Sequence, residues 1–146
     1  MYGLLADHNC EGHVEALLRV CRSERWREFW TPLRVRLCTF DSLGIAWNLS
    51  DAKLWNLCQQ KRLYLITANR NSHGIESLQQ TIHLHGAPES LPVLTLGKAN
   101  RIITDPSYEE CAAIRLLEIL SEPDLEKGTG RLFLPPTAEV EEIIPP

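Results

Sequence analysis

The sequence predicts an α/β fold, a three-layer α/β/α arrangement around a mainly parallel sheet of four or five strands. Two observations support this prediction. Short apolar runs rich in strand-forming residues alternate along the chain with longer amphipathic segments, and several of the runs end at polar turns. Alternating strands and helices at this spacing give parallel strands joined by right-handed crossovers, with helices covering both faces of the sheet.

The first half of the chain contains three of the predicted strands. We predict strands at residues 2–6, 34–40 and 63–67, and helices at residues 11–21 and 51–61. The first of these helices either continues or restarts through residues 24–30, before Pro32 ends it. Charged and apolar residues alternate in the second strand, which favours a position near an edge of the sheet or a strand with one wetter face. Ser50 is a favourable N-cap for the helix that follows it. The inward face of that helix consists of Leu54, Trp55, Leu57 and Cys58.

The second half of the chain continues the same alternation. We predict helices at residues 74–84 and 106–120, and strands at residues 92–96 and 131–134. The helix at 106–120 has the clearest apolar face, formed by Ala112, Ala113, Leu116, Leu117 and Leu120. Residues 1–134 therefore form a single predicted domain, and residues 135–146 form a tail rich in proline and glutamate.

The composition indicates a compact protein with its own core. The chain has 146 residues, of which 44% are hydrophobic and 23% charged. The formal net charge of −4 argues against a protein that coats nucleic acid, although a local basic patch remains compatible with it. No apolar run is long enough for a membrane span, and Asp7 and Glu11 interrupt any signal-peptide core. We therefore expect a cytoplasmic protein with no membrane partner.

The cysteines do not form a recognisable metal or disulfide pattern. The five cysteines include no CxxC pair, and a chain that can bury a core does not need a disulfide framework. We expect four of them to be small buried hydrophobic residues, namely Cys21, Cys38, Cys58 and Cys111. Glycine-rich phosphate loops are absent as well, because neither GxGxxG nor GxxxxGK[ST] follows any predicted strand. This excludes the two commonest nucleotide-binding functions of such a fold.

Polar side chains gather where the predicted strands end. Because the carboxyl ends of parallel strands meet at one edge, we expect the following residues to cluster there: Asp7, Asn9, Asp41, Asp51, Asn69 and Asn71. Carboxylates and amides in such a crevice suit a hard divalent ion such as Mg²⁺ or Mn²⁺. The alternative is that Asp51 only complements the dipole of its helix and the asparagines are ordinary turn residues.

Three short motifs follow one another within residues 2–72. They are Asp7-His8-Asn9, then Asp41-Ser42-Leu43-Gly44-Ile45 with Ser50-Asp51, then Thr67-Ala68-Asn69-Arg70-Asn71. Their order and spacing resemble the short prokaryotic branch of the PIN-like family, the compact nuclease fold of VapC-type toxins. That family carries Asp-x-Asn, then Asp-Leu-Gly-Leu and Ser-Asp, then Thr-x-Asp-x-Asp.

The resemblance implies a metal-dependent ribonuclease that acts on single-stranded RNA. Such a protein is the toxin of a toxin–antitoxin pair, and a small antitoxin protein inhibits it by covering the site. In this chain Asp7, Asp51 and Asn69 would hold Mg²⁺ or Mn²⁺, with Asn71 completing the ligand shell or orienting water and phosphate. Arg70 would contact the scissile phosphate.

The chain departs from the family at the third motif. Asn69 and Asn71 stand where the family has aspartates, and an amide oxygen carries no charge and cannot act as a base. Two interpretations follow. Either the enzyme works with fewer carboxylate ligands, or the chain is a catalytically degenerate PIN-like module that binds protein or RNA without hydrolysis.

Other side chains near the motifs are candidate contacts with a substrate or partner. Trp47 lies in the loop before Ser50 and could stack on a base, and Asn9 is a candidate substrate-binding residue beside Asp7. Trp26 and Trp30 share one helical face, which predicts either a core position or a homodimer surface.

Overall fold

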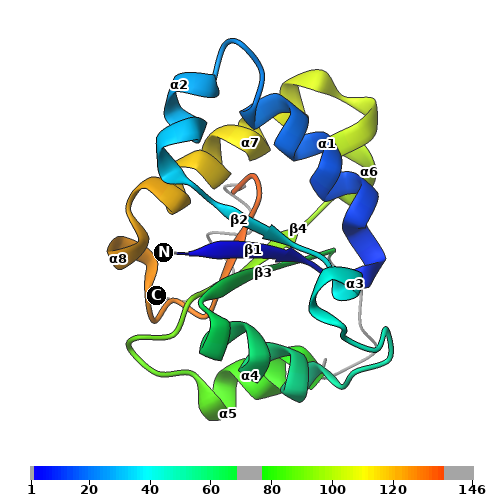
Figure 1. The fold of residues 1–146 in the computed structure, drawn as a ribbon, viewed down its shortest axis with the longest axis vertical. Coiled ribbons are helices and arrows are strands. Elements are labelled where there is room, and N and C mark those ends of the chain that lie inside the picture. Colours follow the sequence, from blue (N-terminus) through cyan, green and yellow to red (C-terminus); the bar gives the residue numbers. More distant parts are fainter. Residues whose placement is uncertain (1, 69–76, 137–146) are drawn as a thin grey trace.

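The computed structural model describes residues 2–68 and 77–136. Five parallel strands form one sheet with the order β2-β1-β3-β4-β5, and helices cover both of its faces (Figure 1). The strands are β1 (Gly3–Ala6), β2 (Arg36–Cys38), β3 (Leu63–Ala68), β4 (Val93–Leu96) and β5 (Arg131–Phe133). The predicted three-layer α/β fold is therefore confirmed, and β2 lies at an edge of the sheet, the first of its two predicted alternatives.

The longer helices begin and end close to their predicted limits. They are α1 (Glu11–Cys21), α4 (Asp51–Lys61), α5 (Ser77–His85) and α7 (Pro106–Ser121). The shorter elements are α2 (Arg27–Trp30), α3 (Phe40–Leu43), α6 (Ala99–Thr104), α8 (Pro123–Glu126) and the 3-10 turns η1 (His8–Cys10) and η2 (Thr31–Leu33). The predicted helix at 24–30 is thus reduced to its last four residues, and α3, α6 and α8 are not predicted from the sequence.

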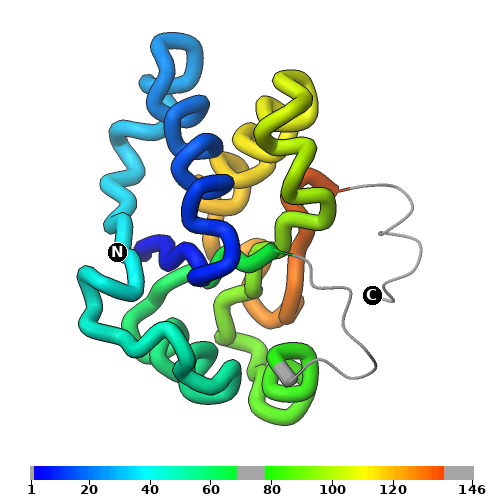
Figure 2. Tube along the Cα trace, turned by 90° about the vertical axis from the view of Figure 1, so that its right-hand side faces the viewer, coloured from blue at the N-terminus to red at the C-terminus, as the bar shows by residue number. Residues whose placement is uncertain are grey.

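Two apolar cores lie on opposite faces of the sheet. Successive side chains of a strand point to opposite faces, so Leu4 packs on the side of α1, α6 and α7, whereas Leu5 packs on the side of α4 and α5. The same alternation in β3 sends Ile66 to the first core and Leu65 to the second. Figures 1 and 2 show the two helical layers above and below the strands.

The cysteines follow this burial pattern with one exception. Cys10, Cys21, Cys38 and Cys58 are buried, but Cys111 is exposed, so the prediction of a buried Cys111 is wrong. The reason is that α7 turns Ala112 and Ala113 toward the core and leaves the preceding residue on its outer side. Burial raises the pKa of the Cys10, Cys21 and Cys58 thiols to about 12, which disfavours their thiolate form.

No helix in the described part of the chain is long and apolar enough to cross a membrane.

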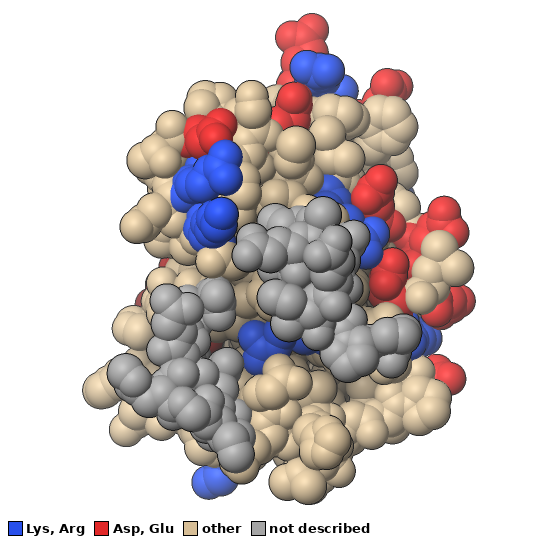
Figure 3. Space-filling view, turned by 180° about the vertical axis from the view of Figure 1, so that it is seen from behind, with Lys and Arg blue, Asp and Glu red and all other residues tan. Residues whose placement is uncertain are grey.

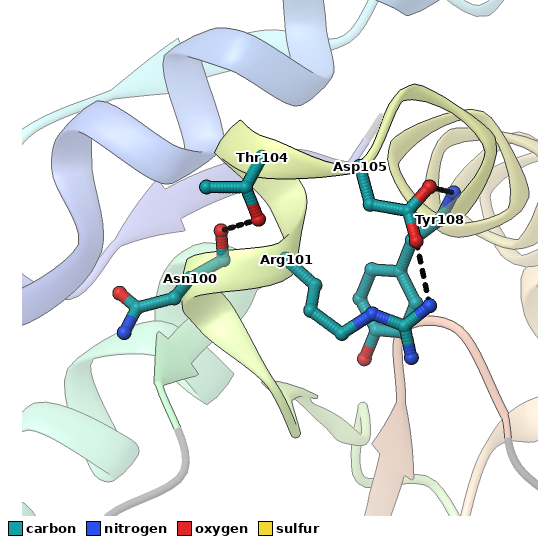
Figure 4. Close-up of polar contacts among 5 residues, drawn as sticks. All are labelled: Asn100, Arg101, Thr104, Asp105 and Tyr108. Atoms are coloured by element: carbon teal, nitrogen blue, oxygen red, sulfur yellow. Dashed lines mark hydrogen bonds and ion pairs between the residues drawn. The ribbon is translucent and has the colours of Figure 1, made fainter.

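A small polar cluster fixes the junction between α6 and α7 (Figure 4). Asp105 caps α7, because its Oδ1 accepts a hydrogen bond from the Tyr108 backbone N–H at 3.2 Å. Its Oδ2 accepts a hydrogen bond from Arg101 Nη2 at 2.6 Å, and the Arg101 guanidinium lies 4.3 Å from the centroid of the Tyr108 ring. The hydrogen bonds from Arg101 and from the Tyr108 backbone hold the pKa of Asp105 below its ordinary value.

This lowered pKa makes part of the stability depend on pH. The ionised Asp105 stabilises the fold above its unfolded-state pKa of about 3.9, and this contribution is lost as the pH falls through the lower folded-state value. Asp105→Asn keeps a capping side chain but loses the ion pair, so we expect it to lower the melting temperature at pH 7. At the lowest pH, where Asp105 is protonated, we expect the variant and wild type to have the same melting temperature. Melting curves across pH 2–7 test this, with Glu24→Gln as a control at an exposed side chain. A difference between Asp105→Asn and wild type that does not change with pH would contradict the prediction.

Tyr64 is a fully buried residue of β3 with a polar atom in an apolar core. Its side chain is 0% exposed, and no hydrogen-bond partner of its hydroxyl is found among the described residues. Burial also raises the pKa of Tyr64 to about 12. An unsatisfied hydroxyl in such a place costs free energy of folding.

We therefore expect Tyr64→Phe to keep or increase the stability of the protein, by up to about 1–2 kcal/mol. The ring and its packing remain while the buried hydroxyl is removed. Urea unfolding measures the effect, and Tyr64→Ala is the comparison, with an expected loss of about 3–5 kcal/mol because it also removes the ring. A loss of more than about 1 kcal/mol in Tyr64→Phe would show that the hydroxyl is hydrogen-bonded after all.

Candidate functional site

The candidate site lies where the strand order of the sheet reverses direction. From β1 the chain crosses to β2 on one side, and from β2 it returns to β3 on the other side of β1. In open parallel sheets such a reversal leaves a crevice outside the carboxyl ends of the two adjacent strands. Here these strands are β1 and β3, which end at Ala6 and Ala68.

Asp7 occupies the carboxyl end of β1 and is held against β3. It is only 6% exposed, and its Oδ2 accepts a hydrogen bond from Thr67 Oγ1 at 2.8 Å. Its backbone N–H donates to the Ile66 carbonyl at 2.8 Å, which continues the β1–β3 pairing by one residue. Thr67 is itself fully buried. A carboxylate is thus fixed in a low-exposure position at the reversal point.

The turn η1 folds back over the end of β3. Asn9 Oδ1 accepts a hydrogen bond from the Ala68 backbone N–H at 3.4 Å, and the Cys10 thiol donates to the Ile66 carbonyl at 3.3 Å. The exposed Asn9 side chain therefore lies at the same edge as Asp7, as predicted, and its amide oxygen contacts the β3 backbone.

Aromatic rings form one rim of this edge. The exposed ring of His8 lies 6.2 Å from the centroid of Phe40 and 6.2 Å from that of Trp47. Phe40 is buried at the start of α3, where Thr39 and Ser42 form a capping box. Trp47 is 71% exposed, so a large flat side chain beside His8 faces solvent.

Asp51 reaches the same edge from α4. Ser50 caps this helix as predicted, with its Oγ accepting a hydrogen bond from the Lys53 backbone N–H at 3.3 Å. The chain leaves β2 at the carboxyl edge and must return to the amino edge to enter β3, so α4 starts on the carboxyl side. Asp51 is the first residue of that helix and is half-buried.

The structure describes only some of the residues that the sequence predicts as metal ligands. Asn69, Arg70 and Asn71 lie outside the described residues, so the roles predicted for them remain predictions. Asp41 is exposed in the first turn of α3. Among residues 2–68 and 77–136, no three His, Cys, Asp or Glu side chains form a group that could hold a metal ion.

Sequence reasoning assigns no role to Thr67 or His8. The signal for Thr67 is a hydroxyl inside an otherwise apolar strand, two residues before a polar turn. Its partner, Asp7, is 60 positions away, and only the register of β1 against β3 brings the two together. The ring of His8 likewise meets Trp47 only after α3 has formed.

No family model matches the sequence, and neither a known protein nor a solved structure is significantly similar to it.

Proposed function

We propose that this chain is a PIN-like, metal-dependent ribonuclease that acts on single-stranded RNA at the carboxyl edge of β1 and β3. The observation that carries the proposal is the buried Asp7 carboxylate at the reversal point of the sheet, held by Thr67. The order of the three sequence motifs supports it, because Thr67 and Ala68, the first two residues of the third motif, contact Asp7 and Asn9 of the first. A role as the toxin of a toxin–antitoxin pair is part of the same proposal.

The side chains at the edge suit Mg²⁺ or Mn²⁺ by the chemistry of their donor atoms. Asp7 and Asp51 offer carboxylate oxygens and Asn9 an amide oxygen, which are the hard ligands that these ions prefer. Asp7, Asp51 and Asn69 would hold the ion, which supplies a water of lowered pKa and neutralises charge on the phosphate. With two charged ligands in this set, we expect weak binding of the ion.

The remaining side chains bind and orient the RNA. Trp47 is exposed beside His8 and offers a flat surface on which a base can stack. Asn9 is exposed, its Oδ1 contacts the Ala68 backbone at the end of β3, and its amide N–H can donate to a phosphate or base. Arg70, which follows β3 in the sequence, completes the proposed contacts by pairing with the phosphate.

A second candidate is a PIN-like module that binds RNA or a protein without hydrolysis. The absence of a three-residue metal-binding group from the described part of the chain favours it, as do the amides at Asn69 and Asn71. In this case Trp47 and His8 still form a binding rim, but no ion is required.

One experiment separates the two candidates. Calorimetry with Mn²⁺ measures ion binding, and a labelled single-stranded RNA is then incubated with Mn²⁺ or with a chelator. The nuclease proposal expects Mn²⁺ to bind and cleavage to stop both with chelator and in Asp7→Asn. RNA binding that survives the chelator, without any cleavage, supports the module. If neither Mn²⁺ nor RNA binds and no cleavage occurs, the nuclease proposal is wrong.

A further inference from the structure

The segment from residue 19 to residue 36 is strongly basic. It contains six arginines and two glutamates, so its formal charge is +4 in a chain whose net charge is −4. All six arginines are exposed, namely Arg19, Arg22, Arg25, Arg27, Arg34 and Arg36. The negative net charge of the chain therefore does not describe this part of its surface, which attracts anions.

This segment lies at the amino edge of the sheet, opposite the candidate site. It runs from the end of α1 through α2 and η2 to the start of β2, on the side where the N-terminus lies (Figure 1). Two further exposed cations, Lys61 and Arg62, come directly before β3. Arg36 connects them to the segment, because its Nη2 donates a hydrogen bond to the Lys61 carbonyl at 2.8 Å. Two separate parts of the chain thus bring basic side chains to one edge.

Three of these arginines line one groove, which has a volume of about 360 Å³. The residues around the groove are Arg22, Arg27, Trp30, Thr31, Arg34 and Val35. Trp30 is only 9% exposed and belongs to the core, so this part of the wall is fixed. Glu24 and Glu28 do not line the groove, and neither does any other acidic residue that the structure describes. The groove is therefore positively charged.

The charges of Arg27 and Arg34 are not used within the described fold. Among residues 2–68 and 77–136, neither side chain has an ion pair or a hydrogen-bond partner. Arg34 also ends η2 in the left-handed conformation, with a φ of 51°, which a residue other than glycine rarely adopts. Arg22 donates from Nε to the Leu18 carbonyl and pairs with Glu15 at 3.6 Å, but its side chain is 42% exposed, so the ion pair is weak. All three guanidinium groups can therefore contact a ligand.

The acidic side chains are concentrated on another part of the surface. On the face seen in Figure 3, they gather mainly on the side where α8 lies. The helix α8 leads into β5, which is at the opposite edge of the sheet from β2. The separation of the two charges directs an anionic ligand to the β2 side.

From these observations we propose that the arginine groove, together with Arg36, Lys61 and Arg62, is a second contact surface for single-stranded RNA. A guanidinium group can donate two parallel hydrogen bonds to one phosphate, so the three arginines of the groove suit successive phosphates of a strand. An extended strand enters a groove, whereas the flat surface of a membrane does not. The choice of RNA among the polyanions rests on the proposed function, but binding at this surface needs neither metal nor cleavage.

Fluorescence anisotropy in the presence of a chelator measures this binding on the full chain without cleavage. The probe is a labelled oligouridylate of about 20 nucleotides, long enough to reach beyond a single groove. We expect binding to weaken as the salt concentration rises, because each phosphate contact releases counterions from the strand.

The double variant Arg27→Gln/Arg34→Asn locates the contact. We expect it to bind the oligouridylate at least about tenfold more weakly at about 0.1 M salt. The slope of log K against log salt should fall in magnitude by about 1.4, since each contact with a single strand contributes about 0.7. Both side chains are exposed, and asparagine tolerates the left-handed conformation of position 34, so the variant should melt at or near the wild-type temperature.

Arg19→Gln/Arg25→Gln is the matched control, because it removes two exposed arginines of the same segment that do not line the groove. An equal loss of affinity in this control would overturn the proposal, since the attraction would then be diffuse. No binding of the oligouridylate at about 10 μM protein in low salt would also overturn it. Tighter binding to polyglutamate, or to vesicles of phosphatidylcholine and phosphatidylserine, would do so as well and would identify another partner.

The cleavage assay separates this proposal from the ribonuclease proposal. If the groove variant loses RNA binding and wild type shows no cleavage with Mn²⁺, the second contact surface stands and the ribonuclease proposal fails. If wild type cleaves RNA with Mn²⁺ and the groove variant binds it as tightly as wild type, the second contact surface alone is wrong.

Discussion

Asp7→Asn is expected to reduce Mn²⁺-dependent cleavage of single-stranded RNA by at least about 100-fold while the protein stays folded. The asparagine keeps an oxygen that can accept the hydrogen bond that Thr67 donates to Asp7 at 2.8 Å. It removes the negative charge of the carboxylate, which is the stronger attraction for a divalent ion. Initial cleavage rates measure the loss of activity, and the Mn²⁺ dissociation constant measures the loss of ion binding.

Asp7→Ala separates the proposed catalytic role of Asp7 from its structural role. It leaves the buried Thr67 hydroxyl without the acceptor, so we expect it to cost about 1–3 kcal/mol of stability in addition to the activity. Thr67→Val removes the same hydrogen bond from the other side and leaves the Asp7 side chain itself unchanged. If Asp7→Asn cleaves RNA as fast as wild type, Asp7 is a structural residue and the edge of β1 and β3 is not a nuclease site.

Local sequence signals predicted the order of the five strands and the longer helices, and several of their boundaries. Ser50 defines the start of α4, and apolar residues at helical spacing define α1, because each signal is contained within its own segment. The start of α6 was not predictable in this way. Lys98 provides no side-chain cap, and only Ile102 of that helix is buried.

Only the part of the candidate site that lies at the ends of predicted strands could be predicted from the sequence. Asp7 and Asn9 could be placed at the carboxyl edge because the strand before them is an apolar run. The contact between Asp7 and Thr67 depends on the register in which β1 pairs with β3. This register cannot be predicted from the residues of either strand alone. The hydrogen bond from Arg131 to Thr95 is a similar case, because the two residues lie 36 positions apart and the pairing of β4 with β5 brings them together.

The double substitution Asn69→Asp/Asn71→Asp should convert weak ion binding into strong binding. Both residues follow β3 directly in the sequence, and the change restores the carboxylates that the PIN-like motif carries. Each added negative charge attracts the ion, so we expect Mn²⁺ to bind at least about tenfold tighter and RNA cleavage to increase. Calorimetry with Mn²⁺ and the RNA cleavage assay measure the two changes.

The stability of the same variant gives an independent test. If residues 69 and 71 belong to the proposed site, their added carboxylates repel Asp7 and Asp51 when no metal is bound, so the double variant should melt below wild type. With Mn²⁺ its melting temperature should rise further than that of wild type, because an ion that binds only the folded state stabilises it by mass action. The control is Asn48→Asp, which adds a charge at an exposed residue outside the three motifs. If the double variant neither binds Mn²⁺ more tightly nor gains more stability from it than this control does, Asn69 and Asn71 do not face an ion, and the second candidate, a module without hydrolysis, is the better interpretation.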